Sequence, residues 1–80
     1  MKVRFSKIFL DELDGFPILI EKKFRKQLNF LLSNIRHPSL RAKKYSESGN
    51  VWQARVDKNI RFYFTVEGDT YILTEIKYHP

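Results

Sequence analysis

Hydrophobic and polar positions alternate at the start of the chain and then change to a helical period. Residues 1–5 alternate with a period of two, which predicts a short strand. Ser6 is a candidate N-cap, because its hydroxyl can accept a hydrogen bond from a free amide of the first helical turn. We therefore expect a first helix from residue 7 to about Asp14, where Gly15 is a natural end.

A second and longer helix is predicted by apolar residues at helical spacing. Pro17 suits a first helical turn, because its missing N–H needs no helical partner there. The apolar positions then recur four, four, three and four residues apart, which predicts one stripe of an amphipathic helix running to about residue 35. These positions are Ile20, Phe24, Leu28, Leu31 and Ile35. The two helices together form a helical hairpin.

The rest of the chain has the pattern of strands separated by turns. Pro38 ends the helical region, and we expect His37 to cap the C-terminus of the second helix. Three strong strand candidates are rich in aromatic and β-branched residues, and a fourth candidate is weaker. The strong ones are residues 51–56, 60–66 and 71–78, and the weak one is residues 41–45.

These elements predict an α+β fold in a single domain that spans residues 1–80. An N-terminal strand and a helical hairpin pack on one face of a mainly antiparallel sheet of four to five strands.

Strand parity indicates which residues share a face of the sheet, because side chains alternate along a strand. A three-residue loop at residues 57–59, with Asn59 in the left-handed conformation, places Ala54 opposite Phe62. That register makes one face wholly apolar, and we expect this face to lie against the helices. A loop of the same length at residues 67–69 leaves Tyr71 on the other face, together with Leu73.

The face that points away from the helices carries two arginines directly opposite one another. Arg55 and Arg61 repel each other in this arrangement, which is normally avoided. The arrangement becomes favourable if an anion lies between the two side chains, because a guanidinium group donates two parallel hydrogen bonds to a phosphate. The alternative is a salt-bridged, solvated face on which Glu75 satisfies Arg61.

Further residues of this face fit nucleic acid. Tyr63 and Tyr71 offer π faces on which bases can stack. Lys77 lies further along the last strand, and Lys43 or Lys44 on the weaker strand borders the arginines.

The charge balance strengthens the interpretation as an anion-binding face. Fifteen Lys and Arg stand against nine Asp and Glu, which gives a formal net charge of +6 in 80 residues. Such a field favours polyanions such as RNA, DNA, an anionic membrane or an acidic partner, although simple solubility is the other explanation.

Composition also narrows the class of protein. Seven Phe, four Tyr and one Trp can supply a compact core, and no cysteine is present for disulfides or a thiolate metal site. No apolar run reaches the roughly 18 residues of a membrane span, and the N-terminus lacks a signal-peptide pattern. We therefore expect a cytoplasmic protein that needs no metal or other cofactor and does not bind a membrane.

One histidine on the sheet could support RNA cleavage. RNA carries its own nucleophile, the 2′-hydroxyl, so an enzyme needs a proton acceptor, a proton donor and positive charge on the phosphorane oxygens. Arg55 and Arg61 can supply the charge, His79 the donor, and Glu75 or a lysine the acceptor. Alternatively, His79 is an exposed C-terminal residue that has no role. Gly-rich phosphate loops and nucleophile elbows are absent from the sequence.

Four stretches of the sequence resemble, in order and spacing, the RelE/ParE toxins of type II toxin–antitoxin systems. They are residues 35–44 (IRHPSLRAKK), 49–56 (GNVWQARV), 60–64 (IRFYF) and 76–79 (IKYH). The likeness spans nearly the whole chain and implies the RelE-like microbial ribonuclease fold.

The resemblance also implies an activity and partners. RelE-type members cleave mRNA in the ribosomal A site without a metal, by attack of the 2′-hydroxyl. An acidic antitoxin neutralises them, and here it would cover the basic face. Two alternatives from the same superfamily remain: a ParE-like inhibitor of DNA gyrase, and a non-catalytic relative that only binds its antitoxin.

The resemblance assigns roles by position. Arg61 matches the family's transition-state arginine, and His79 matches the histidine of YoeB-like and YafQ-like members. Lys43 and Lys44 match phosphate-binding lysines, while Arg55 is a frequent family arginine. YoeB-like members also place a glutamate general base near residues 41 and 42, where this chain has none.

Overall fold

The computed structural model of the chain describes residues 1–46 and 48–80. Its elements follow the predicted order of a strand, two helices and then further strands. They are β1 (Lys2–Phe5), α1 (Lys7–Asp14), α2 (Ile18–Ser33), the short 3-10 helix η1 (Pro38–Leu40), β2 (Lys43–Ser46), β3 (Val51–Arg55), β4 (Ile60–Glu67) and β5 (Thr70–Tyr78). The predicted α+β class is confirmed.

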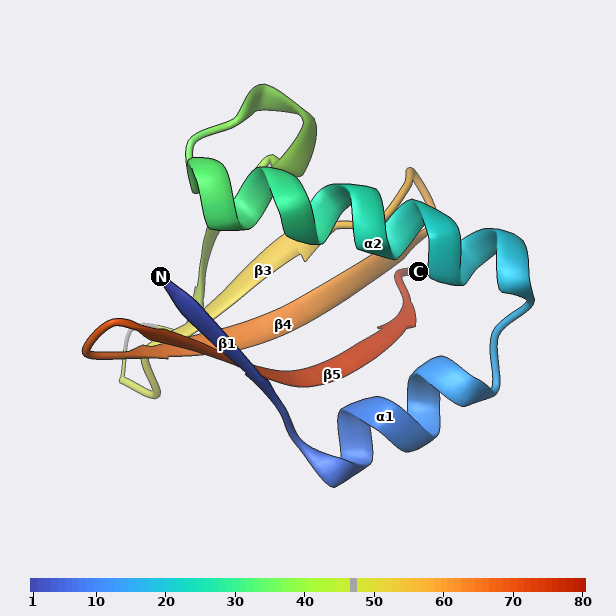
Figure 1. Cartoon of the computed structure of the whole chain (residues 1–80), viewed down its shortest axis with the longest axis horizontal. Coiled ribbons are helices and arrows are strands. Elements are labelled where there is room, and N and C mark those ends of the chain that lie inside the picture. The colour runs from blue at the N-terminus through green and yellow to red at the C-terminus, as the bar shows by residue number, and fades with distance from the viewer. Residues whose placement is uncertain (47) are drawn as a thin grey trace.

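The five strands form one sheet in the order β1-β5-β4-β3-β2. β1 runs parallel to β5, and each of the other neighbouring pairs is antiparallel. Both helices pack on the same side of the sheet, with α2 crossing over β3 and β4 and α1 lying beside β5 (Figure 1). Within the described part of the chain, neither helix is long and apolar enough to cross a membrane.

The core lies between the helices and the sheet and is largely aromatic. The ring centroids of Phe9 in α1 and Phe24 in α2 are 5.1 Å apart, and Phe24 meets Phe62 of β4 edge-on at 5.4 Å. Phe62 is completely buried. Because each phenyl ring buries a large apolar area and edge-on contacts are favourable, this cluster joins both helices to the middle of the sheet.

The start of α1 confirms the predicted cap. The Ser6 hydroxyl accepts a hydrogen bond from the Phe9 N–H at 3.0 Å, and Gly15 follows the helix directly. In α2, Pro17 is the N-cap and lies one residue before the helix rather than within its first turn. The helix ends at Ser33, two residues earlier than expected.

The role predicted for His37 at the end of α2 is wrong. Its ring stacks on Phe30 at a centroid distance of 3.7 Å, with an angle of 6° between the ring planes. Its Nδ1 accepts a hydrogen bond from the Ser39 N–H at 3.1 Å, so it caps η1. The stacking contact holds the imidazole against the side of α2, away from the last carbonyls of the helix.

The register predicted for the first hairpin is confirmed. Ala54 pairs with Phe62, and the Val56 N–H donates to the Ile60 carbonyl at 2.9 Å. The loop is held by Asp57, whose Oδ1 accepts the Asn59 and Ile60 N–H groups at 2.8 and 3.0 Å. Asn59 does not adopt the left-handed conformation that we expected. The aspartate instead satisfies the loop amides directly, as it commonly does in turns.

The register predicted for the second hairpin is wrong. Glu67 pairs with Thr70 across a two-residue turn in which Gly68 has a φ of 59°, a conformation that glycine adopts without a Cβ clash. A bulge then shifts the pairing at the level of Tyr63. Thr74 is the extra residue, and its Oγ1 donates to the Tyr63 carbonyl at 3.2 Å.

The turn and the bulge together reassign several side chains. Before the bulge, Tyr71 and Leu73 are buried in the core rather than on the open face, and burial raises the pKa of Tyr71. After the bulge, Ile76 is buried as predicted, and Glu75 and Lys77 lie on the face away from the helices. The second parity change cancels the first, so the end of β5 from Glu75 onward keeps its predicted orientation.

Candidate functional site

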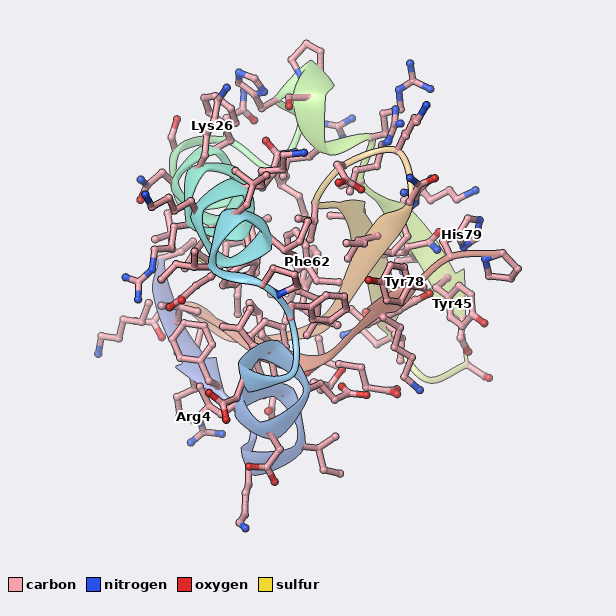
Figure 2. The ribbon with its side chains drawn as sticks, turned by 90° about the vertical axis from the view of Figure 1, so that its right-hand side faces the viewer. Arg4, Lys26, Tyr45, Phe62, Tyr78 and His79 are labelled. Atoms are coloured by element: carbon pink, nitrogen blue, oxygen red, sulfur yellow. The ribbon has the colours of Figure 1, made fainter. Side chains whose placement is uncertain are left out.

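The face of the sheet away from the helices contains a basic hollow of about 360 Å³. Its lining residues are Arg41, Lys43, Gln53, Arg55, Arg61 and His79, and they include no carboxylate. Figure 2 shows His79 on the far side of the sheet from the helices, whereas Phe62 lies between the helices and the sheet. We call this depression the arginine hollow.

The two arginines predicted to face each other do so. Arg55 of β3 and Arg61 of β4 are direct partners in the antiparallel register. Burial and the positive charge of Arg55 lower the pKa of Arg61 from its ordinary value, although Tyr63 and Asp57 act in the opposite direction. An anion between the guanidinium groups would remove this repulsion and gain charge-assisted hydrogen bonds.

The Arg61 guanidinium is positioned by the backbone beside it. Its Nη1 donates to the Asp57 carbonyl at 2.7 Å and to the Ile60 carbonyl at 3.2 Å. Both contacts use the same nitrogen, so the remaining N–H groups have no partner among residues 1–46 and 48–80. A fixed guanidinium with free donors is suited to bind an oxyanion.

His79 follows the end of β5 and belongs to the arginine hollow. Its backbone N–H donates to the Asn59 carbonyl at 2.7 Å, which ties the end of β5 to the β3–β4 loop. The main chain therefore positions this residue, and its imidazole forms no hydrogen bond to residues 1–46 or 48–80.

Glu75 does not bridge the arginines, so that alternative is wrong. The Glu75 carboxylate forms an ion pair with Lys77 on the same strand, and in the register Glu75 lies opposite Tyr63 rather than Arg61. The hydrogen bond and the charge of Glu75 raise the pKa of Lys77. Both residues line a second hollow of about 240 Å³, next to the arginine hollow along the sheet.

This second hollow has an aromatic wall. The rings of Tyr45 and Tyr63 meet edge-on, with centroids 5.1 Å apart. The Tyr63 hydroxyl accepts a hydrogen bond from Gln53 Nε2 at 3.4 Å, which links this wall to the arginine hollow. Sequence reasoning missed Tyr45, although its alternation with Lys43 on a short strand places both on one face.

The two lysines suggested by the sequence lie on different faces. Lys43 pairs with Gln53 and lines the arginine hollow. Lys44 pairs with Trp52, whose ring stacks on core residue Phe64, so Lys44 lies on the helix-covered face. The open face therefore brings together the predicted site residues except Lys44 and Tyr71, which is buried in the core.

A buried glutamine behind the site was also missed. Gln27 of α2 is 5% exposed, and its Nε2 donates to the Ser39 carbonyl at 3.0 Å and the Arg55 carbonyl at 2.8 Å. Its Oε1 accepts the Ser39 hydroxyl at 2.9 Å. This side chain thus joins α2 to η1 and to the end of β3, where Arg55 lies. A polar residue beside the apolar stripe was the only signal in the sequence.

No cluster of three or more His, Cys, Asp or Glu side chains suited to a metal ion occurs in the described ranges. The arrangement offers fixed cations, one imidazole and an aromatic wall on an open sheet. Such a face can bind a phosphodiester, stack bases beside it and transfer a proton.

Solved structures of similar fold are toxins or toxin–antitoxin complexes. A YoeB/ParE toxin from Agrobacterium tumefaciens matches with a TM-score of 0.83 and 13% identity over all of both chains. A RelB–RelE antitoxin–toxin complex from Methanococcus jannaschii matches with a TM-score of 0.76 and 27% identity, over 92% of this chain and 87% of that one. A YoeB–YefM complex from Staphylococcus aureus matches with a TM-score of 0.80 and 18% identity, over 100% and 98% of the two chains.

These matches cover the whole fold, including the strands that carry the arginine hollow. No protein-family model matches the sequence, and no curated protein does.

Proposed function

We propose that this chain, a member of the RelE/ParE superfamily by its fold, is the toxin of a type II toxin–antitoxin system and cleaves mRNA on the ribosome. One observation carries the proposal. Two opposed arginines and a histidine share one hollow that has no carboxylate in its lining and lies on a face that no helix covers. This arrangement is unfavourable for the isolated protein and favourable around a phosphate.

The arginine hollow and the second hollow next to it, which Glu75 lines, together supply the groups that RNA cleavage needs. The 2′-hydroxyl of the substrate attacks the adjacent phosphorus, and the bond from phosphorus to the 5′ oxygen breaks. Arg55 and Arg61 stabilise the charge that develops on the phosphorane oxygens. His79 donates a proton to the departing 5′ oxygen, and Glu75 accepts the proton of the 2′-hydroxyl. The products are a 2′,3′-cyclic phosphate and a 5′-hydroxyl.

The neighbouring residues hold the strand in place. Lys43 borders the arginine hollow and contacts a phosphate, and Lys77, which lies opposite Arg61 in the register and lines the second hollow, contacts another. Tyr63 stacks on a base next to the scissile bond, in the wall it forms with Tyr45. Phosphate contacts and base stacking together fix the reacting bond over the arginines.

An acidic antitoxin is the proposed protein partner. Two of the three structures described above are toxin–antitoxin complexes, and the formal net charge of +6 favours an acidic chain over the open face. A partner that covers the arginine hollow excludes mRNA from it.

Primer extension on a defined mRNA in a translating extract tests the proposal. We expect cuts at codon-dependent positions that appear with the purified protein and vanish when ribosomes are omitted. Intact mRNA under active translation would contradict the proposal. An assay of DNA supercoiling by gyrase then tests the ParE-like alternative.

A further inference from the structure

Arg41 has an unusual backbone conformation at the edge of the arginine hollow. Its φ and ψ are 46° and 43°, in the left-handed region that non-glycine residues seldom adopt. It follows η1, and its N–H donates to the Pro38 carbonyl at 3.3 Å. The side chain is exposed, so no buried contact of its own compensates for the strain. Strain of this kind collects at functional positions.

Arg41 lines three hollows, one of which, of about 240 Å³, it shares with His37 and Trp52. It lines the arginine hollow, and it also lines a hollow of about 400 Å³ at the loop between β3 and β4. The remaining lining residues of this loop hollow are Gln27, Pro38, Ser39, Arg55, Val56, Asp57 and Lys58. Arg41 and Arg55 are common to the arginine hollow and the loop hollow. A strand leaving the arginine hollow in this direction therefore passes beside Arg41 and then Lys58.

The charge of Arg41 adds to that of the arginine pair. It contributes to lowering the pKa of Arg61, so the two guanidinium groups are close enough to repel. No acidic side chain forms a salt bridge with Arg41 in the part of the chain that the structure describes. A third uncompensated cation at this point is unfavourable unless an anion binds there.

From this placement we infer that Arg41 binds a second backbone phosphate of the RNA, outside the phosphate that is cleaved, and directs the strand toward the loop hollow. The inference rests on the proposed function in taking RNA as the ligand. Its left-handed backbone aims the side chain between the arginine hollow and the loop hollow, and the bond to Pro38 holds it there. Arg41 is thus a substrate-binding residue that the cleavage chemistry does not require.

Binding of a labelled RNA hexanucleotide with 2′-O-methyl groups, followed by fluorescence anisotropy across a salt series, tests this role. The 2′-O-methyl groups prevent cleavage, so binding is measured by itself. Arg41→Gly removes the side chain and suits the positive φ, so we expect it to fold. Its affinity at low salt should fall about tenfold. Its slope of log K against log salt should fall by about 0.7, the value for one phosphate on a single strand.

Arg4→Ala is the matched control, because it removes the same charge from β1. Figure 2 shows Arg4 on the opposite side of the molecule from His79. We expect it to keep the wild-type slope. Arg41→Lys keeps a cation at this position and should keep the wild-type slope. It should bind more weakly than wild type, because lysine cannot donate the two parallel hydrogen bonds of a guanidinium group.

The outcomes separate this inference from the proposed function. An Arg41→Gly slope equal to that of wild type overturns the role of Arg41, even if the protein cuts mRNA in the extract. A reduced slope in a protein that leaves mRNA intact supports the role of Arg41 and discards the nuclease. Wild-type protein that does not bind the hexanucleotide overturns the inference together with RNA binding.

Discussion

Phe62 and Tyr63 are neighbours on β4, yet they belong to two very different surfaces. Phe62 is completely buried under the helices, among other aromatic rings. Tyr63 is half-buried on the open face, in the wall of a hollow and beside the opposed arginines. One face of the sheet is built from apolar contacts, and the other gathers like charges that oppose folding.

The difference shows which part of the molecule stabilises it. In an 80-residue chain without cysteine, burial of apolar surface has to supply the stability. The open face contributes little to it, and the repulsion among its arginines subtracts from it. We therefore expect substitutions on the open face to affect the proposed binding more than the stability of the fold.

Replacing the two neighbours on β4 should give the largest contrast in stability. Phe62→Ala should lower the free energy of unfolding by about 3–5 kcal/mol, because it leaves a cavity in the core. Tyr63→Ala should cost about 1 kcal/mol or less and weaken RNA binding instead. Urea unfolding measures both, and equal losses would show that the two faces are not divided in this way.

His79→Ala should lower mRNA cleavage about a hundredfold or more, because a general acid typically contributes that much. Its urea midpoint should stay unchanged, since the bond to Asn59 uses the backbone. His37→Ala is the control on the other histidine. The His37→Ala protein should cut mRNA at the wild-type rate. Its free energy of unfolding should fall by about 1 kcal/mol, because the substitution removes the stacking on Phe30 and the cap of η1. A His79→Ala protein that cuts at the wild-type rate would remove His79 from the site.

Gln27→Leu tests how the covered face supports the open one. The substitution leaves the carbonyls of Ser39 and Arg55 without their buried donor, and it should cost about 1–3 kcal/mol. Cleavage should fall as well, because Arg55 loses its support. The measurement pairs urea unfolding with primer extension, and full activity in the variant would show that Gln27 serves the fold alone.

Substitution of Asp57 should have the smallest effect on stability, and that effect should depend on pH. Burial raises its pKa, but hydrogen bonds from the Asn59 and Ile60 N–H groups and the charge of Lys23 outweigh burial, so the pKa lies below the ordinary value of 3.8. The carboxylate therefore stabilises the fold above pH 3.8, and this contribution is lost as the pH falls through the lower pKa of the folded protein.

The matching substitution is Asp57→Asn, which keeps an oxygen that can accept the loop N–H groups but removes the ion pair with Lys23. It should cost about 0.5–1 kcal/mol at pH 7. At pH 3, the difference in the free energy of unfolding between this variant and wild type, measured by urea unfolding, should be smaller than at pH 7. A difference of equal size at both pH values would mean that the charge of Asp57 does not contribute.

Much of the fold followed from local pattern. The Ser6 cap and Gly15 located the first helix, and the helical period located the second. The turn at Asp57 together with apolar alternation located the register of β3 and β4. That register placed Arg55 opposite Arg61, as the structure confirms, so this pair at the centre of the candidate site follows from the pattern of one hairpin. The role of Gln27 and the backbone of Arg41 were not predicted, because both depend on η1, which packs against α2 and β3.

By itself, then, the sequence determined the order of the two α-helices and five strands, the apolar face of β3 and β4, and the opposed arginines, because each depends on pattern within one hairpin or helix. Only the tertiary structure decided that Tyr71 and Leu73 are buried and that Glu75 pairs with Lys77. The two-residue turn at Gly68 sets the register that buries Tyr71 and Leu73, and the bulge at Thr74 returns Glu75 to the open face. The Thr74 carbonyl accepts a hydrogen bond from the hydroxyl of Ser6 at 3.1 Å. Ser6 is 68 residues away in the chain, and no local pattern can report such a contact.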